Sequence, residues 1–252
     1  MRSQNRLVLL SFSLAILVGQ LGIIPSAAAI PNPIDNGGGR RDRRTASLPA
    51  PPSTPPPPGE RSPGGGLGGD PVCPATPNEL TAITPDTVYG KTLSERPTLW
   101  FYMPYTSADV EQGEFTILTA DDTERVYRAT FTLPEQPGLV SVTLPEAAMI
   151  NLEEGQRYHW YLKVFCASDA TVKSNINING WIDRLATTPE RQQQVTEGSP
   201  EIWYDAVHRL AKHLQTTPCE TMGQLWNELL DSVELEQFIE APILGPLELI
   251  EN

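Results

Sequence analysis

The sequence predicts a mainly β protein, in which an antiparallel β-sandwich of the immunoglobulin/fibronectin-like kind precedes an α-helical hairpin. Short runs of alternating apolar residues, separated by turn residues, fill residues 72–186. One stretch, Leu152-Glu-Glu-Gly-Gln-Arg-Tyr158, has the Leu-x-x-Gly-x-x-Tyr pattern typical of a tyrosine-corner turn. After residue 199 the apolar spacing becomes helical. The predicted organisation is a signal peptide (1–29), a disordered linker (30–71), the sandwich (72–186) and a helical segment packed on it (187–252).

Residues 1–29 have the three parts of a secretory signal peptide. Arg2 and Arg6 precede an apolar run from Leu7 to Ile24, and three alanines ending at Ala29 form a small-residue cleavage site. The alternative is an uncleaved anchor, although about 18 residues is near the lower limit for a spanning helix. We expect cleavage after Ala29. The mature protein is then predicted to have no stable membrane span and to lie in the periplasm, the cell envelope or the extracellular space.

Residues 30–71 are dense in Pro and Gly and contain no periodic apolar pattern. Such a composition buries too little apolar surface to offset the entropy of ordering, so the stretch is predicted to be disordered. It includes a basic cluster, Arg40-Arg41-Asp42-Arg43-Arg44. This cluster either contacts an anionic partner or is a solvated part of the linker.

Seven runs in residues 72–186 predict the strands of the sandwich. They are rich in β-branched and aromatic residues and end at Pro, Gly or acidic turns. No helical pattern separates them, which favours antiparallel pairing. The predicted strands are 80–83, 97–103, 114–118, 125–133, 139–144, 158–166 and 176–182.

The segment 187–252 is predicted to be helical. Ser199-Pro200-Glu201 combines a capping serine, a first-turn proline and an early acid. Apolar residues at helical spacing follow in 202–214 and 222–233, and a short third piece covers 235–239. Two amphipathic helices cannot bury their faces alone, so we expect them to pack on each other and on the sandwich. A helical-repeat unit that binds a partner is the alternative.

Charge excludes one class of partner. The chain carries a formal net charge of −13. From Pro71 onward it has 11 Lys and Arg against 27 Asp and Glu, which gives 11 − 27 = −16. An acidic body repels phosphate backbones, so no nucleic-acid binding is predicted, and the acidic residues are interpreted as a solubilising surface.

The three cysteines predict one disulfide in an exported protein. We expect it between Cys73 and Cys166, because each flanks an element of the predicted sandwich. The bond would close a loop of about 93 residues and stabilise the fold by a few kcal/mol. Cys219 is then either a reactive thiol or a small buried residue at the junction of the helices.

The sequence contains no motif that anchors a reaction. His and Cys lack metal-ligand spacing, and the phosphate-loop and nucleophile-elbow patterns are absent, so no metal or cofactor is predicted. The adjacent acids Asp121-Asp122 and Glu153-Glu154 lie in predicted turns, where solvation explains them. We therefore expect a protein that is not an enzyme.

Two polar or aromatic groups form the predicted ligand surface. Alternation places large aromatic residues on one face of the strand 97–103, and three asparagines share one side of the run 174–179. If exposed, such groups bind sugars or peptides; if covered, the aromatic residues are core. The candidate residues are Trp100, Tyr102, Tyr105, Asn175, Asn177 and Asn179.

Three stretches resemble an exported cyanobacterial family of unknown function. They are Leu-Ser-Glu-Arg-Pro-Thr-Leu-Trp-Phe-Tyr-Met-Pro-Tyr (93–105), Asn-Gly-Trp-Ile-Asp-Arg (179–184) and Ile-Trp-Tyr-Asp-Ala (202–206). The resemblance implies a periplasmic or envelope location and supplies no catalytic residues.

These observations favour a non-catalytic interaction module that binds an envelope protein or a glycan. The alternatives are a carbohydrate-active hydrolase with unidentified carboxylates and a structural accessory domain. Exposed clustered aromatic residues would support binding, two acids facing each other across a deep pocket would support hydrolysis, and a featureless surface would support the accessory role.

Overall fold

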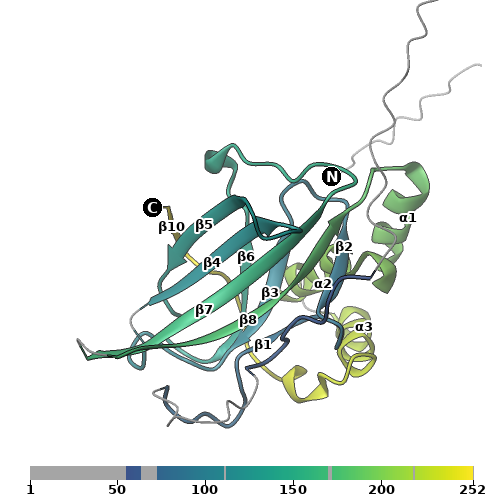
Figure 1. Ribbon diagram of the computed structural model, residues 1–252. Helices are drawn as coiled ribbons and strands as arrows, with labels where there is room; N and C mark the ends of the chain where they lie inside the picture. The colour runs from purple at the N-terminus through teal and green to yellow at the C-terminus, as the bar shows by residue number, and fades with distance from the viewer. Residues whose placement is uncertain (1–54, 64–72, 111, 170–171, 218, 252) are drawn as a thin grey trace, which may run out of the picture. The chain divides into compact units, whose positions relative to one another are not determined.

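A six-stranded sheet in the order β10-β5-β4-β7-β8-β2 is the larger of two layers in the computed structural model (Figure 1), which describes residues 55–63, 73–110, 112–169, 172–217 and 219–251. All of its pairs are antiparallel except β2 with β8, which run parallel. The strands are β2 (Tyr89–Thr92), β4 (Gln112–Thr119), β5 (Arg125–Phe131), β7 (Arg157–Asp169), β8 (Val172–Arg184) and β10 (Leu249–Glu251).

A four-stranded sheet in the order β1-β3-β6-β9 is the second layer. Its strands are β1 (Thr81–Ala82), β3 (Thr98–Met103), β6 (Gly138–Thr143) and β9 (Ile243–Pro246). β9 pairs with β6 in parallel. The protein is therefore mainly β, as predicted, but the sheets are mixed, which corrects the prediction of antiparallel pairing. The cause is that β2 and β9 are short strands without apolar alternation, and each reaches a sheet edge from a distant part of the chain.

The two sheets pack through large aromatic side chains. Phe101 of β3 lies with its ring centroid 6.4 Å from that of Phe115 in β4 and 5.4 Å from that of Trp160 in β7. Both contacts are edge-on, the geometry that aromatic pairs prefer over a face-to-face sandwich. Phe101, Phe115 and Trp160 are almost fully buried. They join the sheets in one hydrophobic core.

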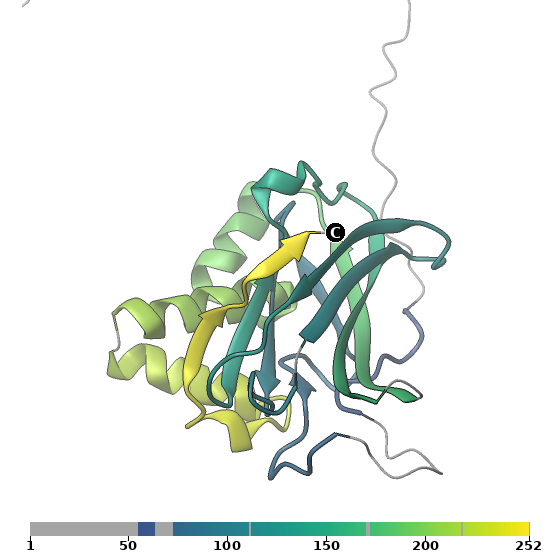
Figure 2. The same ribbon diagram turned by 90° about the vertical axis from the view of Figure 1, so that its left-hand side faces the viewer.

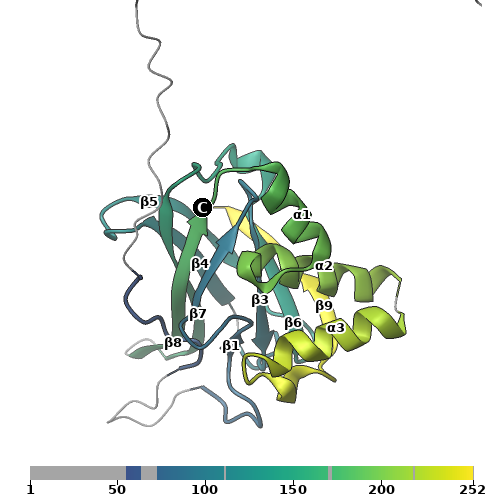
Figure 3. The same cartoon turned by 90° about the vertical axis from the view of Figure 1, so that its right-hand side faces the viewer.

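Helices cover the four-stranded sheet on the side away from this core (Figure 3). Trp203 of α2 donates from its indole nitrogen to the carbonyl of Ile83, at 2.8 Å. Tyr102 of β3 stacks on Phe238, with centroids 4.4 Å apart. Through these contacts the C-terminal helical part packs on the four-stranded sheet. The helices are α1 (Pro189–Glu197), α2 (Trp203–Thr216) and α3 (Glu220–Asp231), with 3₁₀ turns at Glu146–Ala148, Pro200–Ile202 and Glu236–Phe238.

The segment 187–252 is not only helical. Its residues Ile243–Pro246 and Leu249–Glu251 form β9 and β10, which Figure 2 shows in yellow. Helix α1 was also absent from the sequence prediction, because its nine residues contain no apolar stripe. It begins with a cap in which the Thr188 hydroxyl accepts from the Arg191 backbone N–H at 3.3 Å.

The tyrosine-corner contact is present. The backbone N–H of Glu153 donates to the hydroxyl of Tyr158 at 2.8 Å. Gly155 has a φ of 78°, the left-handed conformation that glycine adopts without cost. This turn sets the start of β7, so that Tyr158 points into the core.

The predicted disulfide between Cys73 and Cys166 is confirmed, with a Cα–Cα distance of 4.8 Å. It ties the segment before β1 to β7. Cys219 is a free and exposed thiol, so the interpretation as a small buried residue is wrong. The cause is its position at the N-terminal cap of α3, at the outer end of the helical pair.

Residues 55–63 fall within the predicted linker, yet they contact the folded part of the chain. Glu60 pairs with Asn179 through two backbone hydrogen bonds of 2.9 and 3.1 Å. The Arg61 guanidinium donates to the carbonyl of Val233 at 2.7 Å. The Glu60–Asn179 pairing extends the edge of β8 and the Arg61 bond reaches the segment after α3, so the disordered linker cannot include this piece. The predicted signal peptide (1–29) and basic cluster (40–44) lie outside the described residues.

In the part of the chain that the structure describes, no helix has the length and apolarity to cross a membrane.

Candidate functional site

The three aromatic residues of the predicted ligand surface are buried. Trp100, Tyr102 and Tyr105 are 3%, 9% and 4% exposed. Trp100 faces α2, where its ring centroid is 6.3 Å from that of His208. The prediction of an exposed aromatic surface is therefore wrong for these residues. For Trp100 and Tyr102 the physical reason is that the helical layer covers the face of β3 opposite the sheet–sheet core.

The three asparagines lie on a different layer, on β8. Asn175 is exposed, and Asn177 and Asn179 are partly exposed. Strand register pairs them with alternate residues of β7: Phe165 with Asn175, Lys163 with Asn177, and Tyr161 with Asn179. The asparagines therefore belong to the solvent side of the six-stranded sheet, far in the fold from the aromatic residues grouped with them by sequence.

We call this solvent side the outer sheet face. It follows from the alternation of β7, because Tyr158, Trp160, Leu162 and Val164 are buried against the other sheet and the residues between them point outward. Figure 1 shows no helix in front of β5, β4, β7 and β8. The outer sheet face consists of Glu114, Thr116, Leu118, Asp122, Thr123, Arg125, Arg128, His159, Tyr161, Lys163, Phe165, Asn175, Asn177, Asn179 and Trp181.

His159 organises one end of this face. Its Nδ1 lies 2.8 Å from Asp122 Oδ1 and its Nε2 lies 3.0 Å from Asn179 Oδ1. The Tyr161 hydroxyl is 3.0 Å from the same Nδ1. The imidazole is buried and stacked on Trp181. Four side chains from β7, β8 and the β4–β5 turn are thus fixed by one ring.

The turn that supplies Asp122 has an unusual backbone. Asp122 has a φ of 58°, a conformation uncommon outside glycine and best tolerated by Asn and Asp. Thr119 and Thr123 both donate their hydroxyls to Asp121, at 2.7 and 2.8 Å. These bonds lower the pKa of Asp121. Hydrogen bonds within the turn therefore fix its conformation, in which the Asp122 carboxylate contacts His159.

A groove of about 510 Å³ crosses the face beside this cluster. Three of its lining residues are cations, Arg125, Arg128 and Lys163. Arg128 donates from Nε to Glu114 at 2.8 Å, while no described acid forms an ion pair with Arg125 or Lys163. Two cations are therefore open to a ligand on a protein whose charge is otherwise strongly negative.

Further polar groups line the groove or lie next to it on β8. Burial, with the Asp122 carboxylate as a second cause, raises the pKa of Tyr161, so its hydroxyl stays protonated and can donate. Asn177 Oδ1 is a buried acceptor without a hydrogen-bond partner in the described structure, and Asn177 lies opposite Lys163. An unpaired buried acceptor is costly unless a ligand or water completes it. The face thus offers cations, amides, hydroxyls and a tyrosine ring.

A buried ion pair joins the same two strands next to the His159 cluster, on the same face of the sheet. Arg157 of β7 donates from Nε to Asp183 Oδ1 at 2.7 Å, and the Tyr89 hydroxyl donates to Asp183 Oδ2 at 2.7 Å. Burial and the hydrogen bond to Asp183 raise the pKa of Tyr89 to about 12. Tyr89 belongs to β2, so the pair fastens β2, β7 and β8 together near the His159 cluster.

The described residues contain no group of three or more His, Cys, Asp or Glu placed to hold a metal ion. The predicted strand 158–166 contains His159, but its sequence pattern did not reveal the contribution of Tyr161, Lys163, Arg125 and Arg128. The detectable signal was the even spacing of 159, 161, 163 and 165, which share one face of β7. The antiparallel pairing of β7 with β8 places residues 161, 163 and 165 opposite Asn179, Asn177 and Asn175.

The fold and this face define a class of protein: a mainly β domain of two mixed sheets, helix-covered on one side and open and polar on the other. The chain belongs to a family described as Domain of Unknown Function (DUF928), whose model matches residues 59–243. No curated protein and no solved structure matches it. The membership confirms the predicted relation to a family of unknown function.

Proposed function

We propose that the protein is an exported, non-catalytic module that binds an acidic glycan on the outer sheet face. The observation that carries this proposal is the groove in which Arg125, Arg128 and Lys163 converge beside Tyr161 on a body with a charge of −16. Cations recognise carboxylate or sulfate groups, and the aromatic ring and the asparagines match the apolar and hydroxyl parts of a sugar.

Export is supported by two features. The first 29 residues have the composition of a signal peptide, and the folded part contains a disulfide between Cys73 and Cys166. Disulfides form and persist in oxidising compartments such as the periplasm and the extracellular space. A binding module in such a compartment would meet envelope glycans directly.

The hydrogen bonds of the two acids that line the groove, Glu114 and Asp122, favour binding over hydrolysis. Glycoside hydrolysis uses two carboxylates that face the scissile bond. Here Glu114 accepts from Arg128, and Asp122 is bonded to His159. Both carboxylates thus have positioning partners, which suits a fixed recognition surface.

The test is titration calorimetry of the mature protein with polygalacturonate, alginate and neutral dextran at low salt. We expect binding to the two acidic polymers that weakens as salt rises, since exposed charge pairs are screened. The variant Arg125→Gln/Lys163→Gln should bind at least about tenfold more weakly, which corresponds to ~1.4 kcal/mol. Lys212→Gln, on the exposed surface of α2, is the control with unchanged affinity. Equal affinity for dextran, or full binding by the double variant, would contradict the proposal.

A further inference from the structure

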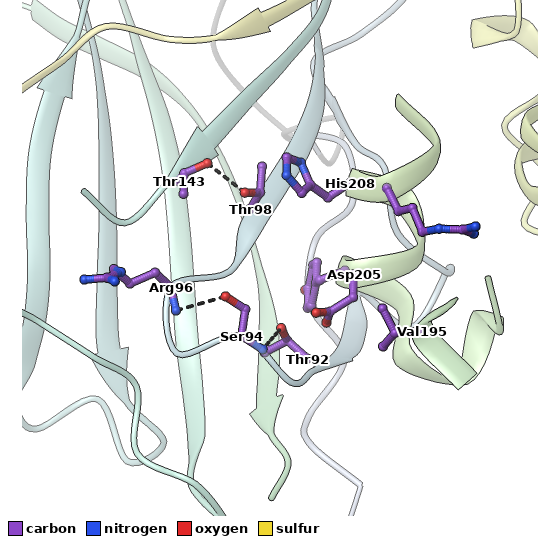
Figure 4. A pocket seen from close by; sticks show the side chains of 10 residues that line it. Thr92, Ser94, Arg96, Thr98, Thr143, Val195, Asp205 and His208 are labelled. Carbon is purple, nitrogen blue, oxygen red and sulfur yellow. Dashed lines mark hydrogen bonds between the residues drawn. The ribbon is translucent and has the colours of Figure 1, made fainter. Parts of the chain in front are cut away.

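A second hollow lies on the opposite side of the fold, between α2 and the connection from β2 to β3 (Figure 4). Its volume is about 350 Å³, within the range of roughly 300–1,000 Å³ typical of small-molecule sites. A neighbouring hollow of about 400 Å³ shares Ser94, Val195 and Asp205 with it. The space therefore continues from α2 toward α1.

Polar groups from three parts of the chain meet in this hollow. Asp205 and His208 project from α2 toward the β2–β3 connection and β3 (Figure 4). Thr98 of β3 and Thr143 of β6 share a hydroxyl hydrogen bond of 2.7 Å. Ser94 completes the set from the connection. These groups include donors, acceptors and hydroxyls that can act as either.

The fold holds the two α2 side chains in place. Asp205 Oδ2 accepts from the backbone N–H of Leu93 at 3.0 Å, which joins the helix to the connection. Burial raises the pKa of Asp205. His208 Nδ1 is buried and has no hydrogen-bond partner in the described structure, and burial lowers the His208 pKa. A neutral histidine with one unpaired nitrogen is unexplained by packing alone, because buried polar atoms are almost always paired.

The charges do not favour an ion. Asp205 is the single carboxyl among the lining residues, and Arg209 is the lining cation without a described ion pair, since Arg96 is paired with Glu95 at 3.3 Å, so the two open charges offset each other. Figure 4 shows the Arg96 side chain directed away from Asp205 and His208. Val195 supplies an apolar wall. Hydroxyl groups, which donate and accept at once, match Asp205, His208 and the serine and threonine hydroxyls better than a charged group does.

We infer that this hollow is a binding site for a small uncharged polyol, of monosaccharide size, and that it is separate from the outer sheet face. Ser94, Thr98, Thr143, Asp205 and His208 provide the hydrogen bonds, and Val195 closes one wall. The site does not depend on the acidic-glycan proposal, because it shares no residue with the groove.

The experiment is an NMR titration of the ¹⁵N-labelled mature protein with D-glucose, D-galactose, D-mannose and, as a charged comparison, D-glucuronate. We expect at least one neutral hexose to shift the amides of Leu93, Ser94 and Asp205, and to bind more tightly than D-glucuronate. Asp205→Asn keeps an acceptor for Leu93 but should weaken binding about tenfold or more, as loss of a charge-assisted hydrogen bond does.

A second variant tests the site without touching its polar groups. Val195→Trp fills the hollow from α1, a helix with no fully buried residue, and should abolish the shifts. Glu228→Gln, on the exposed side of α3, is the control for Asp205→Asn: it also removes one negative charge and should leave the shifts intact. The inference is overturned if no neutral hexose shifts these amides, if Val195→Trp binds as well as the parent, or if shifts occur only at Thr116 and Tyr161. The last pattern would place all binding on the outer sheet face.

Discussion

The imidazole of His159 lies flat on the indole of Trp181, with ring centroids 3.9 Å apart and planes inclined by 9°. The two residues are direct cross-strand partners on β7 and β8. Because the stack fixes the plane of the imidazole, its two nitrogens are aimed at Asp122 and Asn179. This aromatic pair therefore sets how His159 contacts Asp122 in the β4–β5 turn and Asn179 on β8.

His159→Phe separates stacking from hydrogen bonding. Phenylalanine keeps a ring against Trp181 but loses the bonds to Asp122 and Asn179. We expect the free energy of unfolding to fall by about 1–3 kcal/mol, since partners are left unpaired. Hydrogen exchange should accelerate in the Thr119–Glu124 turn. Tyr161→Phe, which removes one hydroxyl, should have a smaller effect; equal effects would show that the histidine bonds are unimportant.

Reduction of the Cys73–Cys166 bond should destabilise the protein by about 2–5 kcal/mol, because the bond constrains a long loop in the unfolded chain. Urea unfolding of Cys73→Ser/Cys166→Ser and of the parent measures this difference. Cys219→Ser should be neutral, since that thiol is exposed. A double variant as stable as the parent would contradict the expectation.

The Arg157–Asp183 pair predicts strong coupling between two buried charges. Their side chains are 7% and 3% exposed. Asp183→Asn should cost about 3–5 kcal/mol, because it removes the acid that pairs with the buried Arg157 guanidinium. Arg157→Met/Asp183→Leu should recover part of that loss. Chemical denaturation of single and double variants completes the cycle, and additive losses would show that the charges act independently.

Stability should depend on pH through two residues one turn apart on α2, with opposite signs. Burial lowers the pKa of His208 below its ordinary 6.5. The stability linked to a lowered histidine pKa is complete above 6.5 and is lost as pH falls through the folded-state value. His208→Gln should remove that loss. Unfolding free energies measured from pH 7.5 to 4.5 test this, and parallel curves for parent and variant would refute it.

Through Asp205, the free energy of unfolding should change with pH in the opposite direction. Burial raises its pKa above the ordinary 3.8. The stability linked to a raised carboxyl pKa is complete below 3.8 and is lost as pH rises through the folded-state value. Asp205→Asn should therefore gain stability relative to the parent as pH rises from about 4, in the same unfolding series. A constant difference across this range would exclude the titration of Asp205.

Gly59 is placed where a side chain does not fit. A Cβ there would lie 2.5 Å from the carbonyl oxygen of Asn179. Gly59→Ala should therefore displace the Glu60–Asn179 pairing and cost about 1–3 kcal/mol, with faster amide exchange at both residues. Gly223→Ala in α3 meets no neighbour and should instead stabilise by up to about 1 kcal/mol. Unchanged exchange in Gly59→Ala would show that the segment adapts.

Strong local patterns predicted much of the fold. The run 158–166 lies within β7, and the helix begun at Ser199-Pro200 is followed through the 3₁₀ turn into α2. The Cys73–Cys166 pairing was also predictable from position. Of the missing elements, β2, β9 and α1 contain Gly or Pro, and β10 has only three residues. These elements are stabilised by contacts with residues that are distant in the sequence, and a local sequence pattern carries no information about such contacts.

The candidate site was less predictable. Asn175, Asn177 and Asn179 were identified as one side of a strand, and they do lie on the open face. Trp100 and Tyr102 were grouped with them because alternation fixes which residues share a face but not which layer covers that face. The sequence did not assign Arg125, Arg128 and Lys163 to the site, because only the register of the strands places these cations beside Tyr161.

Residues 243–251 complete both sheets: β9 pairs with β6 in one and β10 with β5 in the other. Their partners precede them by about 100 residues or more, for example Ile250 opposite Thr130. Such long-range pairing slows folding, because a large loop must close before the contact is gained. Until this piece is synthesised, β5 and β6 are open edges that can recruit strands from other molecules. A nascent chain is therefore at greatest risk of aggregation just before its last strands arrive.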